Sequence, residues 1–357
     1  MGSHYSSNLR ILVAVLETNQ AGFDNPPLDA FDVRIWEPVV TPIIEADDEA
    51  SKYATGDHGE DESIMGAQSA TIEFSVKMNS SSSKDTLSRP AWFKFAEACG
   101  CAVKDYNNGS GYALQPLKSQ DVSTMTIFVY DIPRSGSEIA RYKFSGCMGN
   151  MTIGAEGVGK PWVANFSFTG KLAEIKSVED HPSLNITDKT VAEKMLNYKL
   201  DFHGLGLDTG KSQKISTFSL DIGNEISPLI DQADSTGYAY YSITKRSPRF
   251  SCNPLMNGSF KTLFDSWKDN KTFSVVMRSN DGKGFTLRIP KAQTLTSAVA
   301  SREGLINWDL NLKALRNDIV LPEDNLNYQE VTWELIIGEK PDDVKLAAKA
   351  KKSAGNK

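Results

Sequence analysis

The sequence predicts a mainly β protein made of two similar units in tandem, each a β-sandwich or half-barrel with one flanking α-helix. Three observations support this: strand patterns dominate, two amphipathic helices stand apart from them, and the order of elements repeats. With 357 residues, 40% of them hydrophobic, the chain is long enough for two units with buried cores.

Strands are predicted wherever apolar and polar residues alternate or β-branched and aromatic residues cluster. The first part of the chain has such runs at residues 31–39, 70–78, 124–132, 140–146 and 162–170. The second part has them at residues 216–224, 238–246, 272–279, 285–290, 305–312 and 331–338.

Two segments, RPAWFKFAEACG (89–100) and NGSFKTLFDSWKD (257–269), have apolar residues three and four positions apart, the spacing of one helix face. Pro90 and Ser259 suit the starts of these helices, and Gly100 suits the end of the first. We expect both faces to lie in the core: Trp92, Phe95 and Cys99 in the first helix, and Phe260, Leu263, Phe264 and Trp267 in the second.

The order strand, strand, helix, strand, strand, strand occurs in residues 31–170 and again in residues 216–313. Trp92 aligns with Phe260, and Asn165 with Asn307, while the segment 297–304 (SAVASREG) takes the place of the turn GAEGVGKP. The predicted organisation is an N-terminal arm (1–30), a first unit (31–180) with a long loop at 40–66, a linker (181–215), a second unit (216–340) and a Lys-rich tail (341–357).

Two charged segments lie outside this plan. Residues 45–62 contain eight acids and one Lys, and residues 344–357 contain five Lys. Such runs are usually solvated loops or tails. Their opposite signs also allow a contact between subunits, through Glu45, Asp47, Asp48, Glu49, Glu60, Asp61 and Glu62 on one side and Lys345, Lys349, Lys351 and Lys352 on the other.

The segment GAEGVGKP (154–161) is one residue short of a phosphate-binding loop, because Pro161 stands where a Ser or Thr would bind Mg²⁺. A strand rather than a helix is predicted to follow it, so no helix N-terminus would face a phosphate. We therefore expect a glycine-rich turn between two antiparallel strands.

No other motif predicts chemistry. The four His form no H-E-x-x-H pair, no G-x-S-x-G nucleophile elbow occurs, and His58 in the acidic segment matches no calcium loop. We expect no enzyme activity, no metal and no cofactor. Cys99, Cys101, Cys147 and Cys252 are expected to be buried thiols, with cross-linking between chains as the alternative.

The net charge of −6 argues against firm binding of nucleic acid, whose phosphates attract basic surfaces. No run of about 18 apolar residues occurs, so no membrane segment is predicted.

Several stretches in order resemble the major tail tube proteins of long-tailed bacteriophages. They lie at residues 9–38 (LRILVAVLETNQAGFDNPPLDAFDVRIWEP), 66–103, 123–131, 144–170, 218–224 (FSLDIGN) and 302–312 (REGLINWDLNL). The resemblance covers about residues 9–339. Among these stretches, the polar loop followed by Pro, an aromatic-rich helix and ACG (98–100) is the most telling.

This resemblance implies a structural virion protein whose strands join across subunits into a hollow tube. Two units in one chain imply a trimeric ring with pseudo-sixfold symmetry, stacked into a conduit for genome delivery. The implied partners are other copies of the chain and the tape measure, baseplate and tail terminator proteins, with DNA as a transient, non-specific cargo of a negatively charged lumen. The protein would be assembled in the host cytoplasm and reside in the virion tail, with the arm (about 5–30), segment 40–66 and the tail in contact between rings.

Two other functions stay open at this point. A baseplate hub or tail-completion protein would form one ring and stop. A carbohydrate-binding module would need exposed aromatic residues in a cleft, for which GYAYY (237–241) is the one candidate, although these residues also suit a strand.

Overall fold

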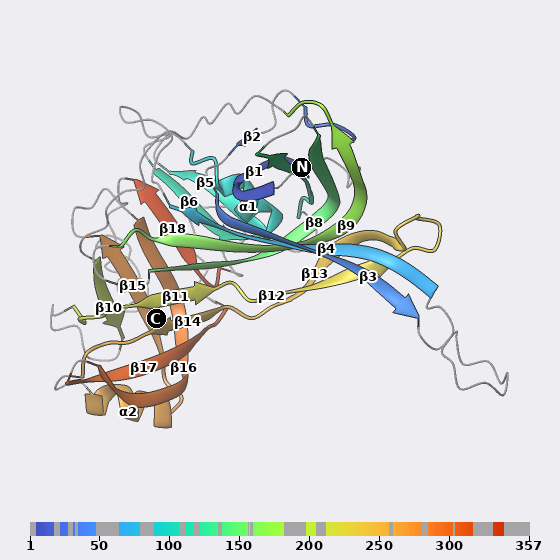
Figure 1. Ribbon diagram of the computed structural model, residues 1–357. Helices are drawn as coiled ribbons and strands as arrows, with labels where there is room; N and C mark the ends of the chain where they lie inside the picture. Colours follow the sequence, from blue (N-terminus) through green and yellow to red (C-terminus); the bar gives the residue numbers. More distant parts are fainter. Residues whose placement is uncertain are drawn as a thin grey trace, which may run out of the picture.

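The computed structural model describes seventeen parts of the chain: 5–17, 22–27, 31–32, 35–47, 64–78, 89–106, 111–117, 122–134, 138–155, 157, 160–181, 198–204, 212–256, 260–279, 285–302, 304–316 and 331–338. Strands make up most of these residues, which confirms the mainly β prediction (Figure 1). Every segment predicted as a strand overlaps an observed strand.

The first part of the chain contains β1 (Tyr5–Leu16), β2 (Phe31–Asp32), β3 (Trp36–Asp47), β4 (Ile64–Lys77), α1 (Phe93–Ala98), β5 (Cys101–Tyr106), β6 (Gly111–Pro116), β7 (Met125–Pro133), β8 (Ile139–Ala155) and β9 (Val163–Val178). The second part contains β10 (Tyr198–His203), β11 (Phe218–Asp221), β12 (Asn224–Ile230), β13 (Tyr238–Arg246), β14 (Arg249–Cys252), α2 (Phe260–Lys268), β15 (Thr272–Ser279), β16 (Phe285–Arg302), β17 (Leu305–Ala314) and β18 (Glu334–Gly338).

Sixteen of these strands form one branched antiparallel sheet, and β12 and β13 form a second, two-stranded sheet. Within the described residues the large sheet is not a closed barrel, since its main path ends at β2 and β5. Strand β18 pairs with both β16 and β6, so the end of the described chain ties the second part to the β5–β6 hairpin of the first.

The same sequence of antiparallel neighbours occurs in both parts of the chain. In the first part it runs β1–β7–β8–β9–β4–β3. In the second part it runs β10–β15–β16–β17–β14–β11. Along the chain, the helix of each part follows the inner strand of the hairpin, β4 or β14. It precedes β7 in the first part and β15 in the second.

Both ends of segment 40–66, predicted to be a long loop, are strands, and residues 48–63 lie outside the described residues. Residues up to Asp47 belong to β3, residues from Ile64 belong to β4, and the two strands pair as a hairpin from Trp36↔Ser75 to Asp47↔Ile64. Strand β1 lies in the segment assigned to the arm, and β10 in the segment assigned to the linker. The division of the chain into domains stays a prediction.

The second part has an equivalent hairpin, interrupted near its middle. Strands β11 and β14 pair at its base, and β12 and β13 continue it with only a short break at Ile222–Gly223 and at Ser247–Pro248. Gly223 has a φ of +64°, and a side chain there would collide with the backbone of Ser247. Glycine therefore fits the point where the hairpin leaves the large sheet.

One apolar core extends through both parts of the chain. The Trp162 ring, which precedes β9, lies 4.6 Å from Phe218 of β11 and 5.5 Å from Phe285 of β16, measured between ring centroids. All three side chains are buried. Because aromatic contacts of this kind add to the free energy of burial, the two parts stabilise each other rather than folding around separate cores.

Helix α1 carries its apolar face into this core as predicted. Trp92, Phe95 and Cys99 are buried, and the Phe95 ring packs edge-on against Phe74 of β4 at 4.8 Å. Gly100 ends the helix with a φ of +74°, which glycine adopts without strain.

For helix α2 the prediction of a core face is only partly correct. Leu263 is buried, but Phe264 is 44% exposed and Trp267 is half-buried, with the two rings in edge-on contact at 6.0 Å. The side chain of Phe260 lies outside the described residues. Helical spacing identifies an apolar stripe, but the neighbouring strands cover only part of this one.

Candidate assembly surfaces

The charged segments expected to meet between subunits lie mostly outside the described residues. This applies to Asp48, Glu49, Glu60, Asp61, Glu62, Lys345, Lys349, Lys351 and Lys352. Asp47 ends β3, and Glu45 of the same strand accepts a 2.5 Å hydrogen bond from the hydroxyl of Tyr238 in β13. The contact between acidic segment and basic tail therefore stays a prediction, and Glu45 already has a partner within its own chain.

The residues after β1 are attached to the sheet by a buried carboxylate. Glu17 is 3% exposed and accepts hydrogen bonds from the hydroxyls of Thr124 (2.5 Å) and Thr126 (2.6 Å) and from the backbone N–H of Gly146 (2.9 Å). Thr126 also accepts a hydrogen bond from the Phe23 N–H. This part of the predicted arm is thus held by its own chain.

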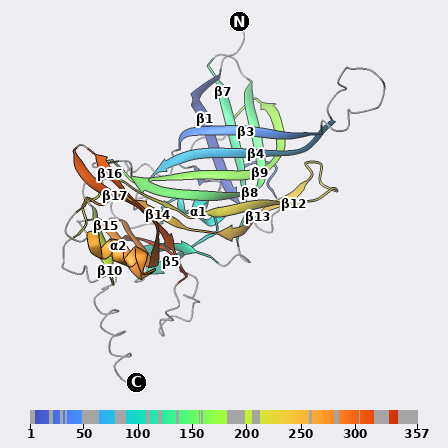
Figure 2. The ribbon, with the colours of Figure 1, turned by 90° about the horizontal axis from the view of Figure 1, so that it is seen from below.

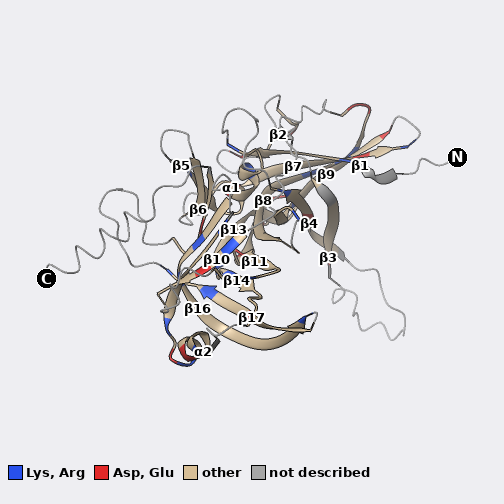
Figure 3. Cartoon of the chain, turned by 90° about the vertical axis from the view of Figure 1, so that its left-hand side faces the viewer, with Lys and Arg blue, Asp and Glu red and all other residues tan. Residues whose placement is uncertain are grey.

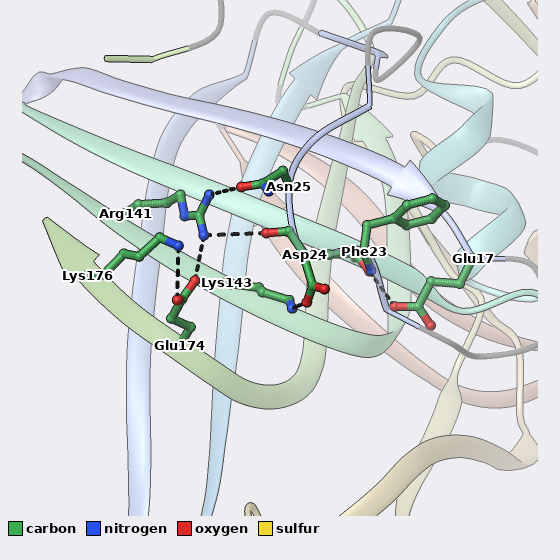
Figure 4. A network of polar contacts seen from close by, with 9 residues as sticks. Glu17, Phe23, Asp24, Asn25, Arg141, Lys143, Glu174 and Lys176 are labelled. Atoms are coloured by element: carbon green, nitrogen blue, oxygen red, sulfur yellow. Dashed lines mark hydrogen bonds and ion pairs between the residues drawn. The ribbon is translucent and has the colours of Figure 1, made fainter. Parts of the chain in front are cut away.

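A second polar cluster holds the following residues against β8 and β9 (Figure 4). The buried guanidinium of Arg141 donates to Asn25 (2.8 Å), to the Asp24 carbonyl (3.4 Å) and to Glu174 (2.5 Å). Lys143 forms an ion pair with the Asp24 carboxylate, and this contact lowers the pKa of Asp24. Residues 22–25 are therefore an intramolecular strap across the sheet.

The glycine-rich segment 154–161 connects two antiparallel strands, β8 and β9, as predicted, and no helix follows it. Beside it lies an open cavity of about 800 Å³, whose lining includes Lys77, Lys160, Arg302 and Asp309. Two of the aromatic residues considered for carbohydrate binding, Tyr238 and Tyr241, are buried in a small apolar cluster with Met148. They offer no stacking surface to a sugar.

The four cysteines are buried and free, as expected. Burial raises the pKa of each thiol, to about 12 for Cys101, so these thiols are protonated and poorly nucleophilic at neutral pH. Within the described ranges, no three His, Cys, Asp or Glu side chains are grouped as a metal site would require. No described helix has the length and apolarity needed to cross a membrane.

Charged residues of both signs are scattered over the described strands (Figure 3). The exposed apolar side chains, in contrast, are concentrated. Of the twelve large ones in the described part of the chain, eight lie in two places: the β3–β4 hairpin has Val39, Ile43, Ile44 and Met65, and the β16–β17 ends have Leu295, Val299, Leu305 and Ile306. Concentrated apolar exposure of this kind marks interaction sites.

These two surfaces lie on different sides of the molecule. In Figure 2 the β3–β4 hairpin projects to the right, together with β12–β13, and the ends of β16 and β17 lie to the left. Neither surface is predicted from the sequence, because the patterns there indicate a loop at residues 40–66 and a turn at residues 297–304. Residues 297–302 are in fact part of β16.

The chain matches no known protein-family model and no curated protein sequence.

Proposed function

We propose that this protein is the subunit of a bacteriophage tail tube, a structural virion protein that polymerises into a hollow conduit for genome delivery. The observation that carries the proposal is the six-strand order β1–β7–β8–β9–β4–β3, which recurs as β10–β15–β16–β17–β14–β11. Together with the ordered resemblance of residues 9–339 to tail tube proteins, it supports two tandem tube-like units in one chain.

Three copies of such a chain would form a ring with pseudo-sixfold symmetry, and rings would stack into the tube. The exposed apolar surfaces on opposite sides of the subunit fit this mode of assembly. When two different surfaces meet head to tail, the subunits form a closed ring or an open filament. A twofold interface would instead use the same surface on both subunits. DNA would pass through the lumen without firm binding, in line with the net charge of −6.

The function is one of assembly, not of catalysis, and needs no cofactor. The tape measure, baseplate and tail terminator proteins would be further partners in a virion tail built in the host cytoplasm. The second candidate, a single-ring hub or tail-completion protein, differs only in that its rings do not stack.

Negative-stain electron microscopy of the purified chain at high concentration tests this proposal. We expect hollow tubes with regular cross-striations and end-on views of threefold rings with sixfold-like outlines. Isolated rings at every concentration would favour the hub. Monomers without rings or tubes, in a sample whose circular dichroism shows folded β structure, would refute the proposal.

A further inference from the structure

Within one chain, the second hairpin lies on the sheet of the first part. Strand β11 pairs with the end of β8, from Phe218↔Ala155 to Asp221↔Thr152, and the Ile222 N–H donates to the Met151 carbonyl (3.1 Å). Beyond this point β12 and β13 cover Met148 with Tyr238, Tyr241 and Ile243. We call this contact the internal junction.

Two polar contacts secure the far end of the internal junction. The Lys171 ammonium of β9 forms a 2.9 Å ion pair with Asp234 at the tip of the hairpin, and the Gln68 N–H donates to the Thr236 carbonyl (2.9 Å). The junction thus combines strand pairing at its base, apolar burial at its centre and charge pairing at its tip.

The strand registers identify which residues of the two parts are equivalent. Asn165 pairs with Ser75 in the first part, and Asn307 bridges to Leu255 in the second. With Asn165 and Asn307 matched, the register breaks also coincide: β8 shifts between Ser145 and Met148, and β16 between Thr294 and Thr296. The same registers match Met151 with Val299 and Ile222 with Ile44.

Equivalent residues differ sharply in exposure. Met151 and Ile222, which meet in the internal junction, are 0% and 3% exposed. Their counterparts Val299 and Ile44 are 63% and 50% exposed. Among the described residues, the second part therefore has a receiving surface that no strand covers, and the first part has a hairpin that is docked on no such surface.

We propose that the β3–β4 hairpin of one copy docks on the β16–β17 ends of a second copy, in the manner of the internal junction. Ile44 then lies beside Val299, as Ile222 lies beside Met151, and Ile43 lies opposite Ala300, as Asp221 lies opposite Thr152. The inference rests on the proposed function, since it names the lateral contact of the ring. Each such contact would cover Ile43 and Ile44 of one copy and Val299 of the other, all of which are exposed in the single chain.

The contact relies on side chains more than on a continuous strand ladder. Pro38 and Pro42 lie in β3, and proline has no N–H to donate to a neighbouring strand. Prolines in an edge strand also limit unspecific pairing with other chains. Apolar contacts of Val39, Ile43 and Ile44 must therefore provide most of the affinity.

Disulfide trapping in the full chain tests this contact. Ile43→Cys with Ala300→Cys places two thiols at directly opposed strand positions, within the span that a disulfide bridges. The four native cysteines are buried and do not compete. After mild oxidation we expect covalent dimers and trimers on a non-reducing gel, lost on reduction. A mixture of the two single variants should give covalent dimers and nothing larger, because each chain then has one engineered thiol.

Ile43→Cys with Ile175→Cys is the matched control, since Ile175 of β9 is 55% exposed but has no place in the contact. Equal cross-linking of the control would overturn the inference. So would the absence of cross-links in a sample that shows rings or tubes by electron microscopy, although the proposed function would then stand. Absence of cross-links, rings and tubes from folded protein would refute both.

Val299→Lys provides a second, independent test if the double variant does not fold. Val299 is exposed, so the variant should fold as the parent does, yet rings should be lost because a Lys is placed in the apolar contact. Rings formed by this variant as readily as by the parent would contradict the docking surface.

Discussion

Strands β8 and β16 occupy equivalent places in the two parts of the chain but meet different surroundings. From Cys147 to Ala155, β8 is buried or half-buried, because β11 and the β12–β13 hairpin lie on it. From Leu295 to Arg302, β16 has no buried residue. The same strand order can therefore produce a core strand in one place and an accessible surface in another.

The local sequences fit these different surroundings. In β8, Gly149 packs so closely that an added Cβ would lie 2.6 Å from the Phe168 ring. The equivalent stretch of β16, TSAVASR (296–302), has small and polar residues around a single large apolar one, Val299. A surface of this mixed kind can be exposed in a free subunit and covered in an assembly.

The largest expected effect comes from shortening the equivalent residues Met151 and Val299. Met151→Ala should lower the free energy of unfolding by about 2–5 kcal/mol, because it leaves a cavity in the core. Val299→Ala should change it by about 0.5 kcal/mol or less, because the side chain is exposed in the free subunit. Urea unfolding of dilute protein, below the concentration of assembly, measures both values. Similar losses for both variants would break the comparison of β8 with β16.

The sequence predicts the strands well because alternation reflects one buried face, as in β15, whose predicted limits are the observed ones. It fails for the outer part of the β3–β4 hairpin. Residues 41–45 are exposed in a two-stranded ribbon, so neither face of the strand has to be apolar and no alternating pattern is needed. Pro42 and Glu45 are residue types that are uncommon in strands, so this stretch shows little strand signal.

The failure at Phe264 and Val299 has a related cause. A periodic pattern shows which side chains share a face, but it does not show whether that face is covered by the same chain. For the candidate contact, the sequence contains the acidic and basic segments that suggest assembly. The apolar surface at Val299 is recognised from the strand registers, which match this exposed residue with the buried Met151.

A smaller effect is expected from removing the buried carboxylate of Glu17, which attaches the residue after β1 to β7 and β8. Glu17→Ala leaves the hydroxyls of Thr124 and Thr126 and the Gly146 N–H without their acceptor, and should cost about 3 kcal/mol. Glu225→Ala is the matched control, because its ion pair with Lys245 is solvent-exposed and should contribute under about 1 kcal/mol. Thermal or urea unfolding compares the two. Equal losses would mean that the buried hydrogen bonds of Glu17 contribute no more to stability than an exposed ion pair.

The smallest effect concerns the charge pair at the tip of the internal junction. Burial raises the pKa of Asp234, but hydrogen bonds from Thr236 and Lys171 lower it more, to about 2, against an ordinary value of 3.8. Because the folded-state pKa is the lower one, the ionised carboxylate stabilises the folded chain above about pH 4. This stabilisation, on the order of 2 kcal/mol, is lost as the pH falls from about 4 through 2.

Asp234→Asn separates this contribution from the general effect of acid. The difference in unfolding free energy between parent and variant should be constant from pH 5 to 7 and should shrink between about pH 4 and 2. Urea unfolding at a series of pH values measures it. A difference that stays constant down to pH 2 would show that the tip contact does not depend on the ionised carboxylate, and the internal junction would then depend on strand pairing and apolar burial alone. That result would make the internal junction resemble the contact inferred between copies, which is argued from apolar side chains alone.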